Sequence, residues 1–278
     1  MLTWGAVSMY TFIKFILYFS IYSFLGWVCE TIYCSILDRK FVNRGFLNGP
    51  VCPVYGFGAL LVIALLDKYR GDIFAIFLLG MIVTSVVEYI TAVILETSFQ
   101  TKWWDYSKHK FNIHGRVCLL NSTLFGLLSV LLIEVINVRI TILVNSVPKI
   151  INIVLAWIII AMFLSDFITT LIAMIKLNDK LNNLVEVLIE LKSMNIKLKN
   201  LEDKEFENLI IRFKDEEESE YVIENLTKIY ERYKKLNVRS MLQRRILKAF
   251  PNIEHTKYKE QFKNLKEIIN NKIKNQNK

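Results

Sequence analysis

Long apolar segments separated by short polar stretches dominate the first part of the chain. These segments cover roughly residues 9–37, 53–66, 73–95, 117–144 and 153–175. A helix rises about 1.5 Å per residue and the hydrocarbon core of a bilayer is about 30 Å thick, so about 20 apolar residues can span it. The pattern therefore predicts an all-α, polytopic membrane helix bundle with about five spans.

The second apolar segment, 53–66, is short for a membrane span. Two prolines and two glycines crowd its start, beginning at Pro50. Irregular backbone at membrane depth is tolerated only where protein or water covers it. This composition favours a re-entrant loop at residues 41–56 that feeds a partly unwound helix, and it leaves the number of spanning helices open.

A different pattern begins after the last apolar segment. Leucines at positions 177, 181, 184, 188, 191 and 198 alternate by fours and threes, with Asn195 where the next apolar position would fall. Such a seam is typical of a dimerising coiled coil or of an amphipathic helix packed on its own tail. We expect a transmembrane domain at 1–176 and a charged, cytoplasmic helical tail at 177–278, and one interpretation of the seam is a homodimer through 177–201.

Composition supports the membrane class and excludes others. The chain is 53% hydrophobic, with a mean hydropathy of +0.34, which is too apolar for an ordinary soluble protein of 278 residues. The net charge of +9 does not indicate nucleic-acid binding, because the tail carries the acidic run 215–218 and no nucleic-acid-binding motif occurs. Basic residues facing anionic lipid explain the excess more simply.

Lysine and arginine are distributed unequally between the polar loops. If the tail is cytoplasmic, seven lie in the inside loops, at positions 39, 40, 44, 102, 108, 110 and 116, and three lie outside, at 68, 70 and 149. Cytoplasmic loops carry the excess of positive charge in membrane proteins. The count predicts a multi-pass protein of the cell membrane with its N-terminus outside and both long loops, 41–56 and 101–122, on the cytoplasmic side.

Ionisable residues within the spans point to a polar cluster. Glu30 and Glu88 each lie in an apolar segment, where a charge costs about 2.5–3.5 kcal/mol or more unless it is paired or hydrated. Arg44, Asp105 and Arg116 lie in the loops on the same side. We predict that these five residues cluster, either lining a substrate path or only holding loops on helices as salt bridges; Asp166 is a further candidate.

Other loop residues allow more than one interpretation. The first loop, with Asn43, can present N–H groups to an anion or form a tight structural turn, which is favoured. In the second loop, which also holds Asn112, the aromatic residues Trp103, Trp104 and Tyr106 fit an interfacial belt or a stacking site for a lipid headgroup or cyclic substrate. The histidines and cysteines lack the spacing of a zinc site, and the sequence predicts no metal and no cofactor.

Several stretches resemble a known family. Residues 22–30, 43–56, 88–90, 103–107 and 111–119 are similar to small bacterial polytopic proteins named Putative ABC-transporter type IV permeases, as is the tail segment 244–251. The resemblance implies a transport component that works with an ATPase on another polypeptide. No G-x-x-x-x-G-K-[ST] motif for ATP occurs in the chain.

Two other functions remain open at this point. One is a membrane enzyme acting on a lipid or isoprenoid at the cytoplasmic leaflet, with Glu30 or Glu88 as general base and Arg44 and Arg116 holding an anionic headgroup. The other is a membrane scaffold or sensor that signals through the leucine seam of the tail.

Overall fold

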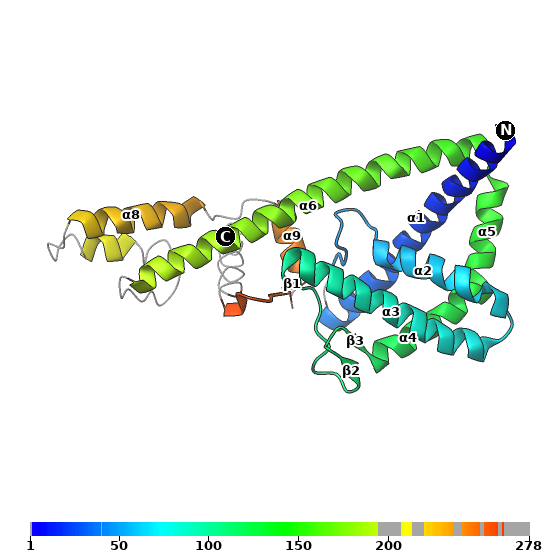
Figure 1. Ribbon diagram of the computed structural model, residues 1–278, viewed down its shortest axis with the longest axis horizontal. Helices are drawn as coiled ribbons and strands as arrows, with labels where there is room; N and C mark the ends of the chain where they lie inside the picture. The colour runs from blue at the N-terminus through cyan, green and yellow to red at the C-terminus, as the bar shows by residue number, and fades with distance from the viewer. Residues whose placement is uncertain are drawn as a thin grey trace. The chain divides into compact units, whose positions relative to one another are not determined.

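The computed structural model describes residues 2–39, 41–193, 207–212, 220–235, 241–250, 253–260 and 263. Its helices and short strands follow in the order α1 (Leu2–Asp38), α2 (Pro53–Leu66), η1 (Asp67–Tyr69), α3 (Ile73–Phe99), β1 (Thr101–Lys102), β2 (Asn112–Ile113), β3 (Val117–Cys118), α4 (Leu119–Leu131), η2 (Leu132–Ile136), α5 (Asn137–Ser146), α6 (Lys149–Ser193), α8 (Glu220–Lys235), α9 (Met241–Ala249) and β4 (Glu254–His255) (Figure 1). The predicted all-α class is confirmed.

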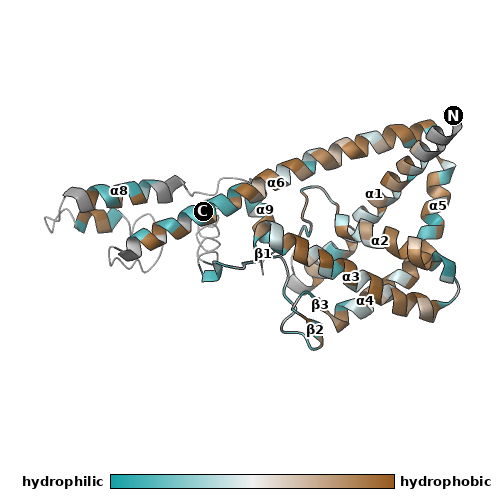
Figure 2. Ribbon diagram, viewed as in Figure 1, coloured by the Kyte–Doolittle hydropathy of each residue, from teal (hydrophilic) through white to brown (hydrophobic). Residues whose placement is uncertain are grey.

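Four helical stretches are long and apolar enough to cross a membrane. They are Met9–Ile36, Ile73–Phe99, Leu119–Ser146 and Lys149–Val187. Figure 2 shows apolar residues along α3, α4 and the first part of α6, where a soluble protein would carry polar ones. The third stretch joins α4, the single π-helical turn η2 and α5 without a break. The membrane helix bundle expected from the hydropathy pattern is therefore confirmed.

The chain forms two compact units. Unit 1 comprises Met1–Ser98, Lys102–Leu171 and Lys248–Asn252, and unit 2 comprises Phe99–Thr101, Ile172–Leu247 and Ile253–Lys278. Unit 1 thus holds the apolar helices together with a short piece of the distal chain. The division into domains at residue 176 stays a prediction.

Hydrogen bonds and small residues set the helix packing of unit 1. Three side-chain bonds tie α1 to α5 in antiparallel order: Lys14 to Asn145 (2.7 Å), Tyr22 to Asn137 (2.8 Å) and Tyr18 to Thr141 (3.4 Å). Between α3 and α4, Gly80 lies against Ser129, and a Cβ at Gly80 would be 2.5 Å from the Ser129 Cβ. Small residues let helix backbones approach closely where water cannot drive association.

Residues 41–52, here named the extended half-span, run back along α1 into the bundle. The Val42 amide donates to Ser35 Oγ (3.0 Å), Trp27 Nε1 donates to Asn43 (2.8 Å), and the Cys52 amide donates to the Ser23 carbonyl (2.9 Å). The contacts thus descend from Ser35 to Ser23, which is about 18 Å of helix.

The helix α2 carries the chain on in the same direction. Its residues Ala59, Leu60 and Ile63 pack in the cluster around Ile13 and Leu17 of α1. Fourteen residues of helix cover only about 21 Å. The segment 41–66, named here the broken span, is therefore irregular over residues 41–52 and helical over 53–66, which accounts for the short apolar segment in the sequence.

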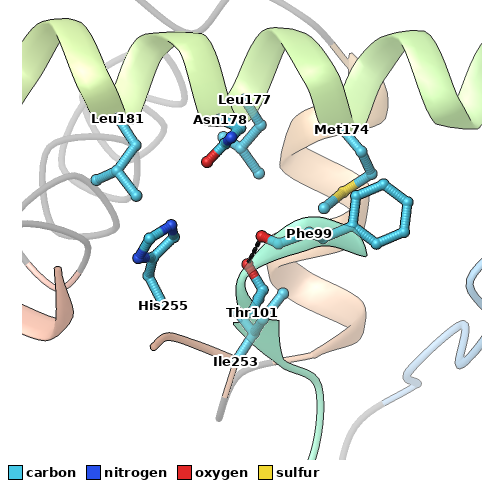
Figure 3. Close-up of a pocket in the computed structure, with 8 residues that line it drawn as sticks. All are labelled: Phe99, Thr101, Met174, Leu177, Asn178, Leu181, Ile253 and His255. Carbon is cyan, nitrogen blue, oxygen red and sulfur yellow. Dashed lines mark hydrogen bonds between the residues drawn. The ribbon is translucent and has the colours of Figure 1, made fainter. Parts of the chain in front are cut away.

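Unit 2 buries part of the predicted leucine seam. Leu177 and Leu181 are buried and line a small cavity of about 10 Å³ with Ile253 and His255 (Figure 3). A space of this size holds at most about one water molecule. At these two positions the seam packs on its own tail.

The rest of the seam is not described. The side chains of Leu184, Leu188 and Leu191, and residues Asn195 and Leu198, lie outside the described part of the chain. The coiled coil and the homodimer therefore stay predictions.

The α1–α2 contact gives a stability prediction with a matched control. A Cβ at Gly56 would clash with Ser23 Oγ and lie 2.8 Å from the Phe19 carbonyl oxygen, whereas a Cβ at Gly58 would meet nothing within 4 Å. We expect Gly56→Ala to destabilise the purified protein by about 1–3 kcal/mol through overpacking. Gly58→Ala should be neutral or stabilising by up to about 1 kcal/mol, because alanine favours helix. Equal midpoints of thermal unfolding in detergent for the two variants would contradict this packing.

Candidate functional site

Glu30 lies where α1, the extended half-span and α2 meet. Its carboxylate pairs with Arg44 (Oε1 to Nε, 3.5 Å) and accepts a hydrogen bond from the Tyr55 hydroxyl. Tyr55 is in the first turn of α2, directly after the helix begins at Pro53, a residue favoured at that position because its missing N–H is not needed there. The start of α2 therefore places the Tyr55 hydroxyl within hydrogen-bond distance of the Glu30 carboxylate.

Arg44 has a second set of partners near the distal end of the chain. Its Nη1 donates to the Ala249 carbonyl (2.6 Å), and its guanidinium lies 4.6 Å from the ring centroid of Phe250. Trp103 packs between Phe250 and Phe46, with ring centroids 4.8 and 5.1 Å away. The pair Ala249 and Phe250 thus completes the surroundings of Arg44 within unit 1.

Glu88 of α3 is a second acid within the apolar helices. Its Oε1 accepts a hydrogen bond from the Tyr106 hydroxyl (3.2 Å), and its buried Oε2 has no hydrogen-bond partner in the described part of the chain. Burial, with the charges of Glu88 and Glu30, raises the pKa of the Tyr106 phenol, which therefore stays neutral and acts as a donor. We name Glu30 and Glu88 the carboxylate pair.

Arg116 binds an acid that was not among the residues of the predicted cluster. Its Nη2 and Nε donate to one oxygen of Glu96 at 2.6 and 3.0 Å, and its Nη1 donates to the Tyr89 hydroxyl (2.9 Å). The bonds to Glu96 raise the pKa of the guanidinium further. Its carbonyl accepts from Trp104 Nε1 (2.9 Å), and His114 Nδ1 is hydrogen-bonded to Tyr89 (3.1 Å). These contacts hold the second loop on the last turns of α3.

Asp105 and Asn112 organise the second loop itself. Asp105 accepts from the Ser107 amide (3.0 Å) and hydroxyl, while Asn112 donates to the His109 carbonyl (2.8 Å) and accepts from the Gly115 amide (3.0 Å). Gly115 has a φ of +71°, and a Cβ there would clash with the Asp105 carboxylate. These hydrogen bonds of Asp105 and Asn112 all have their partners within the second loop.

The backbone N–H groups of the first loop, which the sequence suggested could bind an anion, bind the carboxylate of Asp166 in α6. Its carboxylate accepts from the amides of Asn48 (2.8 Å) and Gly49 (2.7 Å) and from the Thr170 hydroxyl (3.2 Å). Consecutive backbone amides can form an anion-binding concavity. Here the anion is a side chain of the same protein, and it fixes the extended half-span to α6.

The structure thus separates the predicted site residues into groups. Glu30 pairs with Arg44 and Glu88 with Tyr106, while Arg116 and Trp104 belong to the Glu96 group and Asn43 binds Trp27. The interfacial belt expected of the second-loop aromatics is wrong for Trp103, which is only 2% exposed. Among the described residues, no three His, Cys, Asp or Glu side chains are arranged to hold a metal ion.

Sequence reasoning missed Tyr55, Tyr89, Glu96 and Phe250. A usable signal existed for Glu96, because it is an acid near the end of an apolar segment. Phe250 is one of few aromatic residues in a charged stretch and directly precedes Pro251, but nothing in that pattern identifies Arg44 as its partner.

Comparison with known proteins agrees with this architecture. Residues 17–171, more than half of the chain, match the family described as Putative ABC-transporter type IV. The chain belongs to this family. The region matching the Putative ABC-transporter type IV family contains the broken span, the carboxylate pair and the second loop, whereas Ala249 and Phe250 lie beyond it. No curated protein and no solved structure gives a significant match.

The Asp166 contact predicts how firmly the extended half-span is held. In a variant that keeps only Cys52 of the four cysteines, Asp166→Asn should raise the rate of Cys52 labelling by maleimide about tenfold or more, because hydrogen bonds to a charged group contribute about 1.5–3 kcal/mol. Cys52 is buried in the native fold. Glu134→Gln is the control, since Glu134 accepts from the Gly71 amide (2.8 Å) at the other end of the bundle. An unchanged rate in Asp166→Asn would contradict the assigned contact.

Proposed function

We propose that this chain is the membrane subunit of a transporter powered by an ATPase on a separate polypeptide. The observation that carries the proposal is the broken span, which places irregular backbone beside α1 and starts a helix next to Glu30. Transporters build substrate and ion sites at discontinuous helices, where irregular backbone and helix ends meet inside the membrane. Membership of the ABC-transporter family supports the same assignment.

The carboxylate pair is assigned to the polar lining of the path. Glu30 has Arg44 as counter-ion, whereas Glu88 has no basic partner in the described part of the chain and keeps one carboxylate oxygen unbonded. An acid that a membrane protein retains without a basic partner marks a substrate or ion pathway by default. Glu88 is therefore the residue assigned to meet the transported species.

The two alternative functions receive less support. A lipid-acting enzyme would use Arg44 and Arg116 to hold an anionic headgroup, yet both guanidinium groups already bind carboxylates and carbonyl or hydroxyl oxygens of the protein. A scaffold that signals through the leucine seam would need its leucines free, yet Leu177 and Leu181 are buried in their own unit.

Copurification tests the assignment. Tagged protein extracted gently from native membranes should bring with it a nucleotide-binding subunit, and the complex should hydrolyse ATP. Repeated purification without such a subunit would overturn the proposed function.

Within that complex, Glu88→Gln should leave the subunits together and lower ATP turnover by roughly tenfold, which corresponds to about 1.4 kcal/mol of lost stabilisation. Asp67→Asn is the control, because the Asp67 carboxylate forms an exposed pair with Arg70, away from Glu88. Unchanged turnover in Glu88→Gln would remove Glu88 from the path and leave the subunit assignment standing.

We further propose that the N-terminus is outside and that the end of the bundle holding the carboxylate pair faces the cytoplasm, as the distribution of lysine and arginine indicates. In a cysteine-free background, Lys68→Cys should react with an impermeant maleimide added to intact cells, and Lys110→Cys should react only after permeabilisation. The reverse pattern would invert the orientation, and labelling of both from outside would contradict the five-pass arrangement.

A further inference from the structure

The second loop ends in an exposed apolar tip that the proposed transport function does not use. Phe111 is 79% exposed and Ile113 is 58% exposed, although Trp103, Trp104 and Tyr106 of the same loop are buried or half-buried. Exposed apolar side chains grouped at one place mark an interaction surface more often than scattered ones do.

Backbone contacts place this tip at the level where a membrane helix begins. The Leu119 amide donates to the Phe111 carbonyl (3.1 Å), and β2 pairs with β3 in the register Asn112 to Cys118 and Ile113 to Val117. The apolar helical stretch Leu119–Ser146, which is long enough to cross a membrane, starts at Leu119. Leu119 and Leu120 are themselves 46% and 54% exposed, so the tip continues the apolar surface of α4.

The loop presents the tip rigidly. Phe111 and His114 both have a φ of 53°, in the left-handed region, which costs a residue other than glycine about 1–2 kcal/mol. The bonds of Asn112 described above and the Tyr89 contact of His114 hold this conformation in place. Strain of this kind persists where the surrounding structure fixes it, and it is concentrated at functional segments.

Positive charge flanks the apolar tip. Lys108, His109 and Lys110 are all exposed and immediately precede Phe111. In the described part of the chain neither lysine forms an ion pair. A lysine near an anionic lipid surface contributes about 1 kcal/mol of attraction.

We propose that this hairpin is a membrane-interface anchor. Phe111 and Ile113 insert at the boundary between headgroups and acyl chains, and Lys108 and Lys110 bind the phosphate of anionic phospholipids in the same leaflet. Amphipathic surfaces bind membranes through this combination of buried apolar area and attraction to anionic lipid. The anchor holds the second loop, and with it Tyr106 and Arg116, at a fixed depth.

Fluorescence quenching tests the insertion. The full chain, with its native cysteines replaced, would carry Phe111→Cys labelled with an environment-sensitive fluorophore in nanodiscs of phosphatidylcholine and phosphatidylglycerol. Brominated acyl chains should quench this label as they quench one at Ile158→Cys, and iodide in the buffer should leave it bright. Lys228→Cys, on an exposed position of α8, is the aqueous control. If Phe111→Cys folds poorly, Ile113→Cys serves in its place.

Lipid competition tests the charge contribution. Native mass spectrometry should show a preference for phosphatidylglycerol over phosphatidylcholine, and Lys108→Gln with Lys110→Gln should lower this preference by up to about 30-fold, the product of two lysine contributions.

Three outcomes would overturn the anchor. The first is iodide quenching at residue 111 as strong as at residue 228, and the second is an unchanged lipid preference in the double variant. The third is protection of residue 111 only when a copurified protein subunit is present, which would assign the tip to a protein partner.

Discussion

In unit 1, backbone N–H and C=O groups that lie away from water must find hydrogen-bond partners within the protein, and this requirement determines how residues 41–52 pack. The extended half-span makes no helical hydrogen bonds, so its amides need other acceptors at a depth where an unsatisfied group costs several kcal/mol. Those acceptors come from the protein: Ser35 and Ser23 on one side, and the Asp166 carboxylate on the other. The bundle can therefore contain a broken span only because α1 and α6 supply oxygen atoms along its length.

The charged side chains of unit 1 also need partners within the protein where they lie away from water. Arg44 and Arg116 each enter with a loop, and each takes its own acid, Glu30 or Glu96. An ion pair out of water repays its desolvation only when further hydrogen bonds complete it, and the hydroxyls of Tyr55 and Tyr89 provide these. Of the three acids Glu30, Glu88 and Glu96, Glu88 is the one with a neutral partner and an unbonded carboxylate oxygen, and this distinguishes it from the two structural salt bridges.

The sequence was sufficient for the membrane class, and it indicated that Glu30 needs a partner, because burying an acid in an apolar segment demands one whatever the fold. It also predicted irregular backbone before Pro53. It could not assign the pairs. Glu88 and Glu96 are about two turns apart on α3, and which of them Arg116 reaches depends on the path of the second loop, which no local pattern encodes. In the sequence Asp166 resembles a fourth acid of the predicted cluster, because its partners include backbone amides, which have no sequence signature.

The role of the distal chain follows from electrostatics at a helix end. Ala249 is the last residue of α9, and the final carbonyls of a helix lack intrahelical partners and carry the negative end of its dipole. The next residues in the sequence are Phe250 and Pro251, and proline lacks the N–H that a further helical turn would use. A guanidinium suits such an end, and Arg44 donates to it. Arg44 is thus neutralised partly by Glu30 and partly by a helix terminus 205 residues away in the sequence, and no local pattern predicts a contact over that separation.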